Sequence, residues 1–249
     1  VLLLNAFFST AQVGTTSPYS SFGLGDLHGT VISEYASMGG GVTALQNLTS
    51  INPFNPATYA YINPNSFLLS SGIRHNITNI ENVNESQINH ITAYSHFIFA
   101  FPINKKIGAS IGMLPYSDIG YNITTNDNFD TDLIYSGDGG ITKVYFGSGY
   151  SLNNNFSIGM NASYLFGRLN KRKKVLFNDD SFLNSRSNSS INLKGYYYEL
   201  GLLYKNDLSK DQKISIGVML HNNSEIRSKR NYLVETFEYG GLVEFVKDT

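Results

Sequence analysis

The sequence predicts an all-β protein, an antiparallel transmembrane β-barrel of which this chain supplies about eight strands. Large apolar residues alternate with small or polar ones along most of the chain after Tyr61, as in "FSIGMNASYLFG" (156–167). A period of two is typical of strands whose two faces meet different surroundings, and no helical period competes with it. Phe and Tyr gather near the ends of these segments, as aromatic residues do where barrel strands leave the bilayer.

The chain begins with the apolar stretch "VLLLNAFFSTAQ". Its small residues Ser9 and Ala11 resemble a signal-peptide cleavage site, so residues 1–11 are expected to be the remnant of a signal peptide. There is no initiator Met and no basic stretch before it, and we therefore expect the chain as given to be clipped at its start. A buried first strand is the alternative.

Residues 12–65 precede the first expected strand. Half of the six prolines lie in "INPFNPATYAYINPNSF" (51–67), and Pro53, Pro56 and Pro64 each follow an asparagine. Asn-Pro favours turns, and the residue before a proline is pushed out of the helical region. The segment is therefore expected to be neither a regular helix nor a central strand.

The alternation predicts eight strands, at about 67–77, 90–101, 106–117, 139–151, 155–168, 191–205, 212–221 and 231–246. The connections alternate between short ones, such as "PINKK" and "LNNN", and longer polar ones, such as 118–138 and 169–190. Short turns at one end and long loops at the other are typical of outer-membrane barrels. A soluble β-sandwich also alternates, but the face opposite the apolar one carries Gly, Ser and Asn, which favours the barrel.

Eight strands alone would enclose only their own side chains, which leaves no room for the preceding segment. We therefore expect residues 66–249 to be part of a larger barrel and residues 12–65 to form a hatch, or plug, inside it. The polar tail "EFVKDT" fits a turn between two strands of such a barrel.

Composition narrows the possible chemistry. The net charge of −1 gives no general attraction to nucleic acid, and the absence of cysteine excludes disulfides, thiolate metal sites and a cysteine nucleophile. The five histidines show no ligand spacing, and the glycine-rich stretches "GLGD" and "GGG" do not lie between a strand and a helix as phosphate loops do. We therefore expect no enzyme, no catalytic residues, no metal and no cofactor.

Four stretches carry a resemblance to a known family: "SPYSSFGLGDL" (17–27), "MGGGVTALQNLTSINPFNPATYA" (38–60), "AFPINKKIGASIGMLPYSDIGYNI" (100–123) and "GDGGITKVYFGSGYSLNNNFSIGMNASYLFG" (137–167). They resemble FadL-type outer-membrane transport proteins. The resemblance implies a bacterial outer-membrane location, a barrel of fourteen strands with an N-terminal hatch, and passive uptake of hydrophobic or amphipathic small molecules such as long-chain fatty acids. The alternative is a barrel of the same family that acts as a shuttle or assembly component of protein secretion, as in type IX secretion.

The resemblance also implies a place for the Asn-Pro turns, in the hatch at its junction with the first strand. The gating candidates are Asn52, Pro53, Asn55, Pro56 and Ala57. Irregular backbone is tolerated at that depth because it does not face lipid. A turn-rich lead-in with no transport role is the alternative.

Strand parity places four polar residues on the inner face, where they are candidates for contact with a ligand: Arg74, Tyr94, His96 and Glu199. Ordinary wet residues of a polar barrel interior are the alternative.

A basic cluster, "RLNKRKK" (168–174), falls at the start of an expected extracellular loop. Its members are candidates for binding lipopolysaccharide phosphates: Arg168, Lys171, Arg172, Lys173 and Lys174. A solvated loop is the alternative, and no basic face supports nucleic-acid binding.

Overall fold

The alternating segments form one antiparallel sheet. The computed structural model describes residues 14–29, 32, 35, 38–47, 49–81, 86–127, 131–179, 181–210, 212–223, 225–240 and 243–248, so the expected signal-peptide remnant lies outside the described residues. The described part contains ten strands, β1 (Asp26–Leu27), β2 (Leu68–Glu81), β3 (Ser86–Pro102), β4 (Ile107–Asp127), β5 (Thr131–Ser151), β6 (Phe156–Phe177), β7 (Asn184–Asp207), β8 (Lys213–His221), β9 (Arg227–Gly240) and β10 (Val243–Asp248), and two short 3₁₀ helices, η1 (Pro18–Ser21) and η3 (Pro56–Tyr61). The predicted all-β antiparallel class is confirmed.

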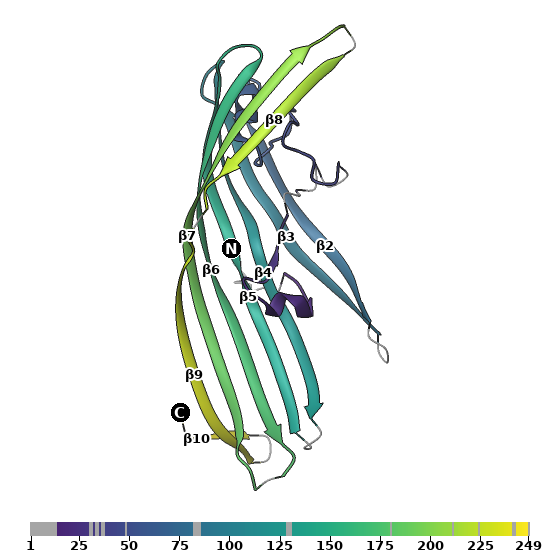
Figure 1. Cartoon of the computed structure of the whole chain (residues 1–249), viewed down its shortest axis with the longest axis vertical. Helices are drawn as coiled ribbons and strands as arrows, with labels where there is room; N and C mark the ends of the chain where they lie inside the picture. Colours follow the sequence, from purple (N-terminus) through teal and green to yellow (C-terminus); the bar gives the residue numbers. More distant parts are fainter. Residues whose placement is uncertain are drawn as a thin grey trace, which may run out of the picture.

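The sheet is curved and open (Figure 1). Its strand order is β10-β9-β7-β6-β5-β4-β3-β2, with β1 added on β4 and β8 on β7. One edge is β2, and the other is divided, because β8 pairs with 199–207 of β7 and β9 pairs with 184–194. The described strands therefore form an open sheet and do not close into a barrel by themselves.

Two of the loops predicted from polarity are wrong. Strands β4, β5, β6 and β7 contain 21, 21, 22 and 24 residues, so most of 118–138 and 169–190 is strand. The ladders run without interruption through these polar residues, with Tyr121 opposite Gly137 and Lys171 opposite Ser189. Ladder hydrogen bonds join backbone groups and need no apolar side chains, so a polar composition did not mark a loop.

The predicted two faces are present. On β6, Phe156, Ile158 and Met160 are 40–48% exposed on the convex side, whereas Ser157 and Asn161 are buried on the concave side. Two aromatic pairs bound the apolar band, Phe156–Tyr204 and Tyr164–Tyr196, with ring centroids 4.6 and 5.4 Å apart. From residue 156 to 164 there are 8 rises of about 3.3 Å, or about 26 Å along the strand. At a strand tilt of about 40° this spans about 20 Å of depth, which lies within the ~25 Å apolar band of outer-membrane barrels.

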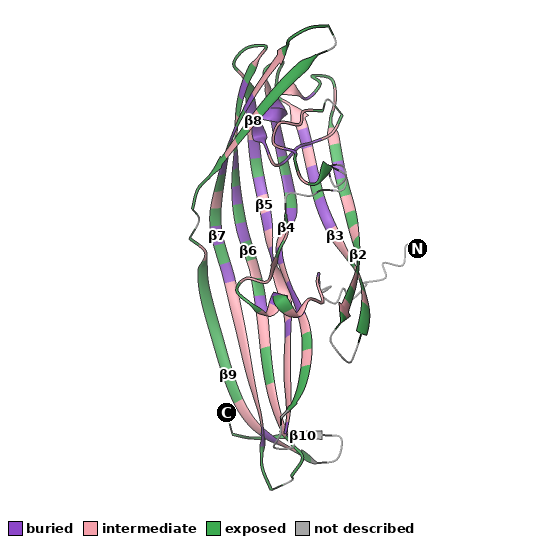
Figure 2. Ribbon diagram, turned by 45° about the vertical axis from the view of Figure 1, so that its right-hand side comes forward, coloured by how far each residue is buried: buried purple, intermediate pink, exposed green. Residues whose placement is uncertain are grey.

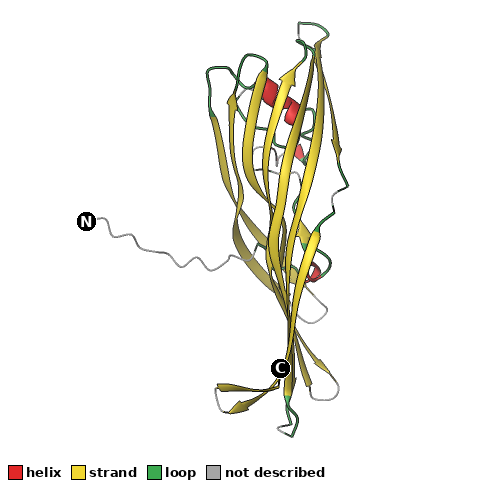
Figure 3. Cartoon of the chain, turned by 90° about the vertical axis from the view of Figure 1, so that its left-hand side faces the viewer, coloured by secondary structure: helices red, strands yellow, loops and turns green. Residues whose placement is uncertain are grey.

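The concave side carries the N-terminal segment. Helix η3 lies near one end of the sheet and η1 further toward the other (Figure 3), and buried residues concentrate where the segment covers the strands (Figure 2). One core cluster joins residues of the segment to inward residues of the strands, with Ile51 and Tyr59 packed beside Ile98, Leu114 and Tyr145. None of the helices in the described ranges is long and apolar enough to cross a membrane.

If the convex band contacts lipid, a charge in its middle must be costly. The Met160→Lys variant is expected to lose ~2–4 kcal/mol of unfolding free energy in lipid, the cost of a cation near the midplane. Urea unfolding of the full-length protein in vesicles measures this, with Met160→Leu as the control. Equal stability of the two variants would show that residue 160 does not face the bilayer interior.

Candidate functional site: the N-terminal segment on the concave face

Two asparagines hold the Asn-Pro stretch in shape. The Asn52 side chain donates to the carbonyls of Val42 (2.7 Å) and Leu45 (2.9 Å) and accepts from the Phe54 amide (3.1 Å). The Asn55 side chain accepts from the Ala57 amide (3.1 Å), which caps η3 with Pro56 at its first position. Both asparagines are at most 2% exposed, so their side-chain amides form hydrogen bonds with other groups of the protein rather than with solvent.

The same stretch is joined to the sheet by polar contacts. The side-chain amide of Asn55 also donates to two carbonyls, that of Thr43 (2.7 Å) and that of Leu202 on β7 (3.2 Å). The Asn161 side chain of β6 donates to the carbonyl of Pro53 (3.0 Å). Proline fixes its own backbone angle and offers an acceptor without a donor, so these turns present carbonyls to the strands. Pro53 and Pro56 thus shape the contact, and Ala57 is wholly buried in it.

A row of glycines forms the seat for η3. Gly108, Gly149, Gly159 and Gly201 are direct partners across β4, β5, β6 and β7. A Cβ atom on any of them would overlap atoms of the Asn55–Tyr59 stretch. Gly108 would meet the Tyr59 carbonyl, Gly149 and Gly159 the Pro56 carbonyl, and Gly201 the Asn55 side chain. Only a residue without a side chain lets the η3 backbone lie this close to the sheet. Gly217 on β8 meets the Thr43 carbonyl in the same way.

The glycine row was not predicted. Each of the four glycines stands on the non-apolar side of its strand, in "KIGAS", "GSGYS", "SIGM" and "ELGLL". The sequence does not show that these four glycines are direct partners across the strands, because that depends on the strand register.

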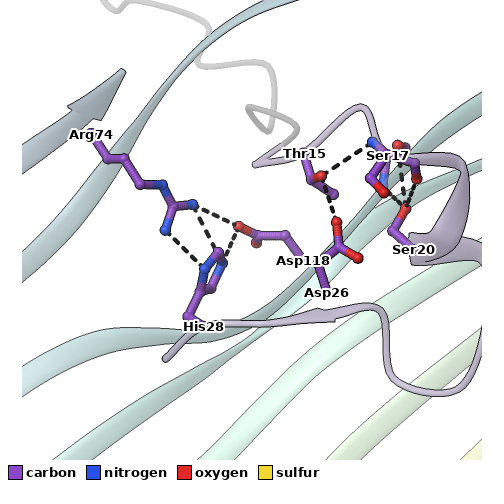
Figure 4. Close-up of polar contacts among 8 residues, drawn as sticks. Thr15, Ser17, Ser20, Asp26, His28, Arg74 and Asp118 are labelled. Atoms are coloured by element: carbon purple, nitrogen blue, oxygen red, sulfur yellow. Dashed lines mark hydrogen bonds and ion pairs between the residues drawn. The ribbon is translucent and has the colours of Figure 1, made fainter. Parts of the chain in front are cut away.

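A second contact ties the segment to two strands (Figure 4). Arg74 Nη1 lies 2.8 Å from His28 Nδ1, and His28 Nε2 lies 2.6 Å from Asp118 Oδ2. Because arginine can only donate, Nδ1 accepts and Nε2–H donates to the carboxylate. Arg74 Nη2 also reaches Asp118 Oδ2 at 3.5 Å. The three side chains join β2, β4 and the chain just after β1.

Nearby, η1 is held by backbone groups of β4. Ser20 Oγ donates to the carbonyl of Gly120 (3.3 Å) and accepts from its amide (3.0 Å). Thr15 Oγ1 donates to Asp26 Oδ2 (2.7 Å). The segment is thus fastened to the sheet at two heights, by η3 and by residues 15–28.

Between these two contacts lies a cavity of about 260 Å³ whose lining includes Arg74, Glu199, Lys143 and His28. Lys143 Nζ donates to both carboxylate oxygens of Glu199 at 3.0 and 3.3 Å, and the Asn161 side chain donates to Glu199 at 3.3 Å. The charges lining the cavity therefore already have partners, Lys143 with Glu199 and Arg74 with Asp118.

The structure divides the four predicted inner-face residues into two groups. Arg74 and Glu199 line the cavity, whereas Tyr94 and His96 are not among its lining residues. His96 is buried with its Nε2 2.8 Å from Ser70 Oγ. Tyr94 and His96 flank Ser95, the extra residue where the β2–β3 register shifts. Whether any of the four contacts a ligand stays a prediction.

Sequence reasoning missed three residues of the site: His28, Asp118 and Lys143. Lys143 stands between inward Ile141 and Tyr145 in "GITKVYF", so strand parity would have identified it. Asp118 lay in a predicted loop that is strand.

Burial raises the pKa of the Tyr59 phenol well above its ordinary value, so this ring stays neutral in the contact. Within the described ranges, no group of three His, Asp or Glu side chains is placed to hold a metal ion.

The basic cluster is not in a loop but in β6, and most of its members already have contacts. Arg172 lies 2.8 Å from Asp138, Lys174 lies 3.1 Å from Glu244, and Lys173 stands over the Tyr135 ring. Lys171 Nζ points inward and donates to the Ser21 carbonyl (2.8 Å). Arg168 is exposed and donates from Nε to Asn192 (3.0 Å).

The glycine seat can be tested with one methyl group. In Gly159→Ala the new Cβ overlaps the Pro56–Ala57 backbone, and we expect a loss of about 1–3 kcal/mol of stability, as for other overpacked sites. Limited proteolysis should then cut residues 38–65 faster. Gly41→Ala is the matched control, since its Cβ meets only ordinary contact. Equal stability and equal cleavage in both variants would contradict the seat.

Comparison with known proteins gives the family. The model of the BamG family matches residues 1–248. No curated protein and no solved structure matches the chain. The expected FadL-type membership is wrong, and with it the expectation of fatty-acid uptake, because the matching family is named for the BAM outer-membrane assembly complex. The stretches that suggested the FadL-type family contain Gly108, Gly149 and Gly159, which let the η3 backbone lie close to the strands, and such close packing is not specific to one family. The chain belongs to the BamG family, and its predicted location in the bacterial outer membrane is confirmed.

Proposed function

We propose that this protein takes part in the assembly of outer-membrane proteins, as a membrane-embedded member of the BAM machinery. The observation that carries this proposal is the BamG match over residues 1–248. Of the two functions considered from the sequence, the assembly role fits this match better than uptake does. The proposed role requires no chemistry from the chain itself.

The concave face supports a scaffold rather than a conduit for apolar molecules. Residues 38–62 pack against the strands by buried polar contacts and the glycine row. The cavity that remains, about 260 Å³, is lined in part by Arg74, Lys143 and Glu199. An apolar chain entering it would strip water from these charges and offer no hydrogen bond in return.

We further propose that the open sheet is part of a closed barrel, with residues 12–65 as its plug and residues 66–249 as part of its wall. Two features support this. The convex face is a band of apolar side chains bounded by aromatic pairs. The outer edges of β2 and β8 carry backbone groups that lipid cannot satisfy, so in the membrane further strands must cover them. Under this proposal the short turns 103–106 and 152–155 face the periplasm.

The assembly role predicts physical association with the BAM machinery. The full-length protein, tagged in its native host and crosslinked before mild solubilisation, is expected to co-purify with BAM subunits. An equally abundant outer-membrane barrel with the same tag is the control. Depletion of the protein is expected to lower the amounts of other outer-membrane barrels. No enrichment of BAM subunits over the control, together with an unchanged outer-membrane proteome, would refute the role.

A further inference from the structure

The second edge of the sheet contains a notch. Strand β8 ends at His221 and β9 begins at Arg227, so residues 195–198 of β7 pair with neither strand on that side. Asn222 bridges part of the gap, since its amide donates to the Tyr198 carbonyl (3.1 Å) and its side chain accepts from the Tyr198 amide (2.7 Å). The notch encloses about 440 Å³, a volume in the range of small-molecule sites.

The base of the notch is aromatic and belongs to the boundary of the convex apolar band that is farther from the short turns. Tyr164, Tyr196 and Tyr198 line it. The Tyr164 and Tyr196 rings pack 5.4 Å apart, and Tyr196 is 66% exposed. Exposed aromatic faces of this kind suit the apolar face of a sugar ring.

Cations form the rim of the notch. Lys194 and Arg227 line it and are direct partners across β7 and β9. In the next row outward, Asn192 is the partner both of Arg168 and of Lys229. All four basic side chains are exposed. Like charges placed directly opposite each other on a sheet destabilise it.

Within the described part of the chain, no carboxylate lies within ion-pair distance of Lys194, Arg227, Arg168 or Lys229. Two other basic residues of the same strands are ion-paired, Arg172 with Asp138 and Arg186 with Glu235. Glu225 also lines the notch but forms no ion pair with these cations. The rim therefore has an excess of positive charge that a bound anion would neutralise.

Apolar side chains continue from the notch toward the short-turn end of the sheet. Met160, Leu200 and Val218 are 45–50% exposed on the convex face. They offer a surface for acyl chains next to the aromatic base, on its short-turn side. The site thus combines, in order along the strands, an apolar track, aromatic rings and a cationic rim.

We propose that this notch binds the phosphorylated disaccharide headgroup of a lipid A-type glycolipid of the outer leaflet. Lys194, Arg227 and Arg168 hold phosphate oxygens by charge-assisted hydrogen bonds. Tyr196 stacks on a sugar ring, and Glu225 accepts from sugar hydroxyls. The leaflet follows from the position of the notch, because it lies where the strands extend beyond the apolar band, opposite the short turns that face the periplasm in barrels of this type.

The test measures lipid binding by the full-length protein, delipidated in detergent, with native mass spectrometry as the readout. Bisphosphorylated lipid A is the probe. The K194Q/R227Q variant is expected to bind it at least about tenfold more weakly, because loss of one hydrogen bond to a charged group has roughly that effect. The matched control is K105Q/K106Q, which removes two exposed lysines from the short turn at the other end. Phosphatidylglycerol, which has one phosphate and no sugar ring, is expected to bind the native protein more weakly than lipid A.

Unchanged lipid A binding by K194Q/R227Q, an equal loss in the lysine control, or equal affinity for phosphatidylglycerol would each overturn the proposal. Circular dichroism melting establishes that the variants fold. Should the double variant fail to fold, R168Q alone decides, with weaker lipid A binding supporting the proposal and unchanged binding overturning it. The result is independent of association with the BAM machinery.

Discussion

The interior of this protein depends on the close approach of the η3 backbone to the glycine row of β4, β5, β6 and β7. Without Cβ atoms at those positions, the Asn55–Tyr59 stretch reaches the strands, and the neighbouring Pro53 carbonyl accepts a hydrogen bond from the Asn161 side chain. The other contacts of the segment depend on this close approach of η3 to the strands. Asn55 reaches the Leu202 carbonyl, and Tyr59 enters the same core as Ile98 and Tyr145. A larger side chain in the row would displace the segment from the strands.

Buried polar groups give this contact its specificity. The Lys143–Glu199 pair is nearly excluded from solvent and shares Asn161 with the Pro53 carbonyl. Such a pair adds little stability against an apolar replacement, but loss of one partner leaves an uncompensated charge. The network therefore favours one arrangement of segment and strands over others of similar apolar contact. The convex side of β6 from Phe156 to Tyr164 instead presents apolar side chains such as Ile158 and Met160.

Much of the fold followed from local rules, and the errors have physical causes. The period of two identified the strands and their faces because side-chain direction alternates regardless of partner. The polar ends of β4 to β7 were mistaken for loops because composition does not report backbone pairing. Strand parity placed Arg74 and Glu199 inward, and both line the cavity, but His28 and Asp118 come together only through tertiary structure. The family was misjudged because short Gly- and Pro-rich stretches report close packing, which unrelated chains share.

The most direct test of the account asks whether the N-terminal segment lies on the concave face in the membrane. Ser215 Oγ of β8 donates to the Ala44 carbonyl at 2.8 Å, and the chain has no native cysteine. The A44C/S215C double variant of the full-length protein should therefore form a disulfide on mild oxidation in native membranes, whereas A44C/L208C, with its second cysteine in the β7–β8 turn, should not. Efficient crosslinking of the first pair alone is the predicted result. Crosslinking of neither pair, or of both equally, would contradict the packed segment.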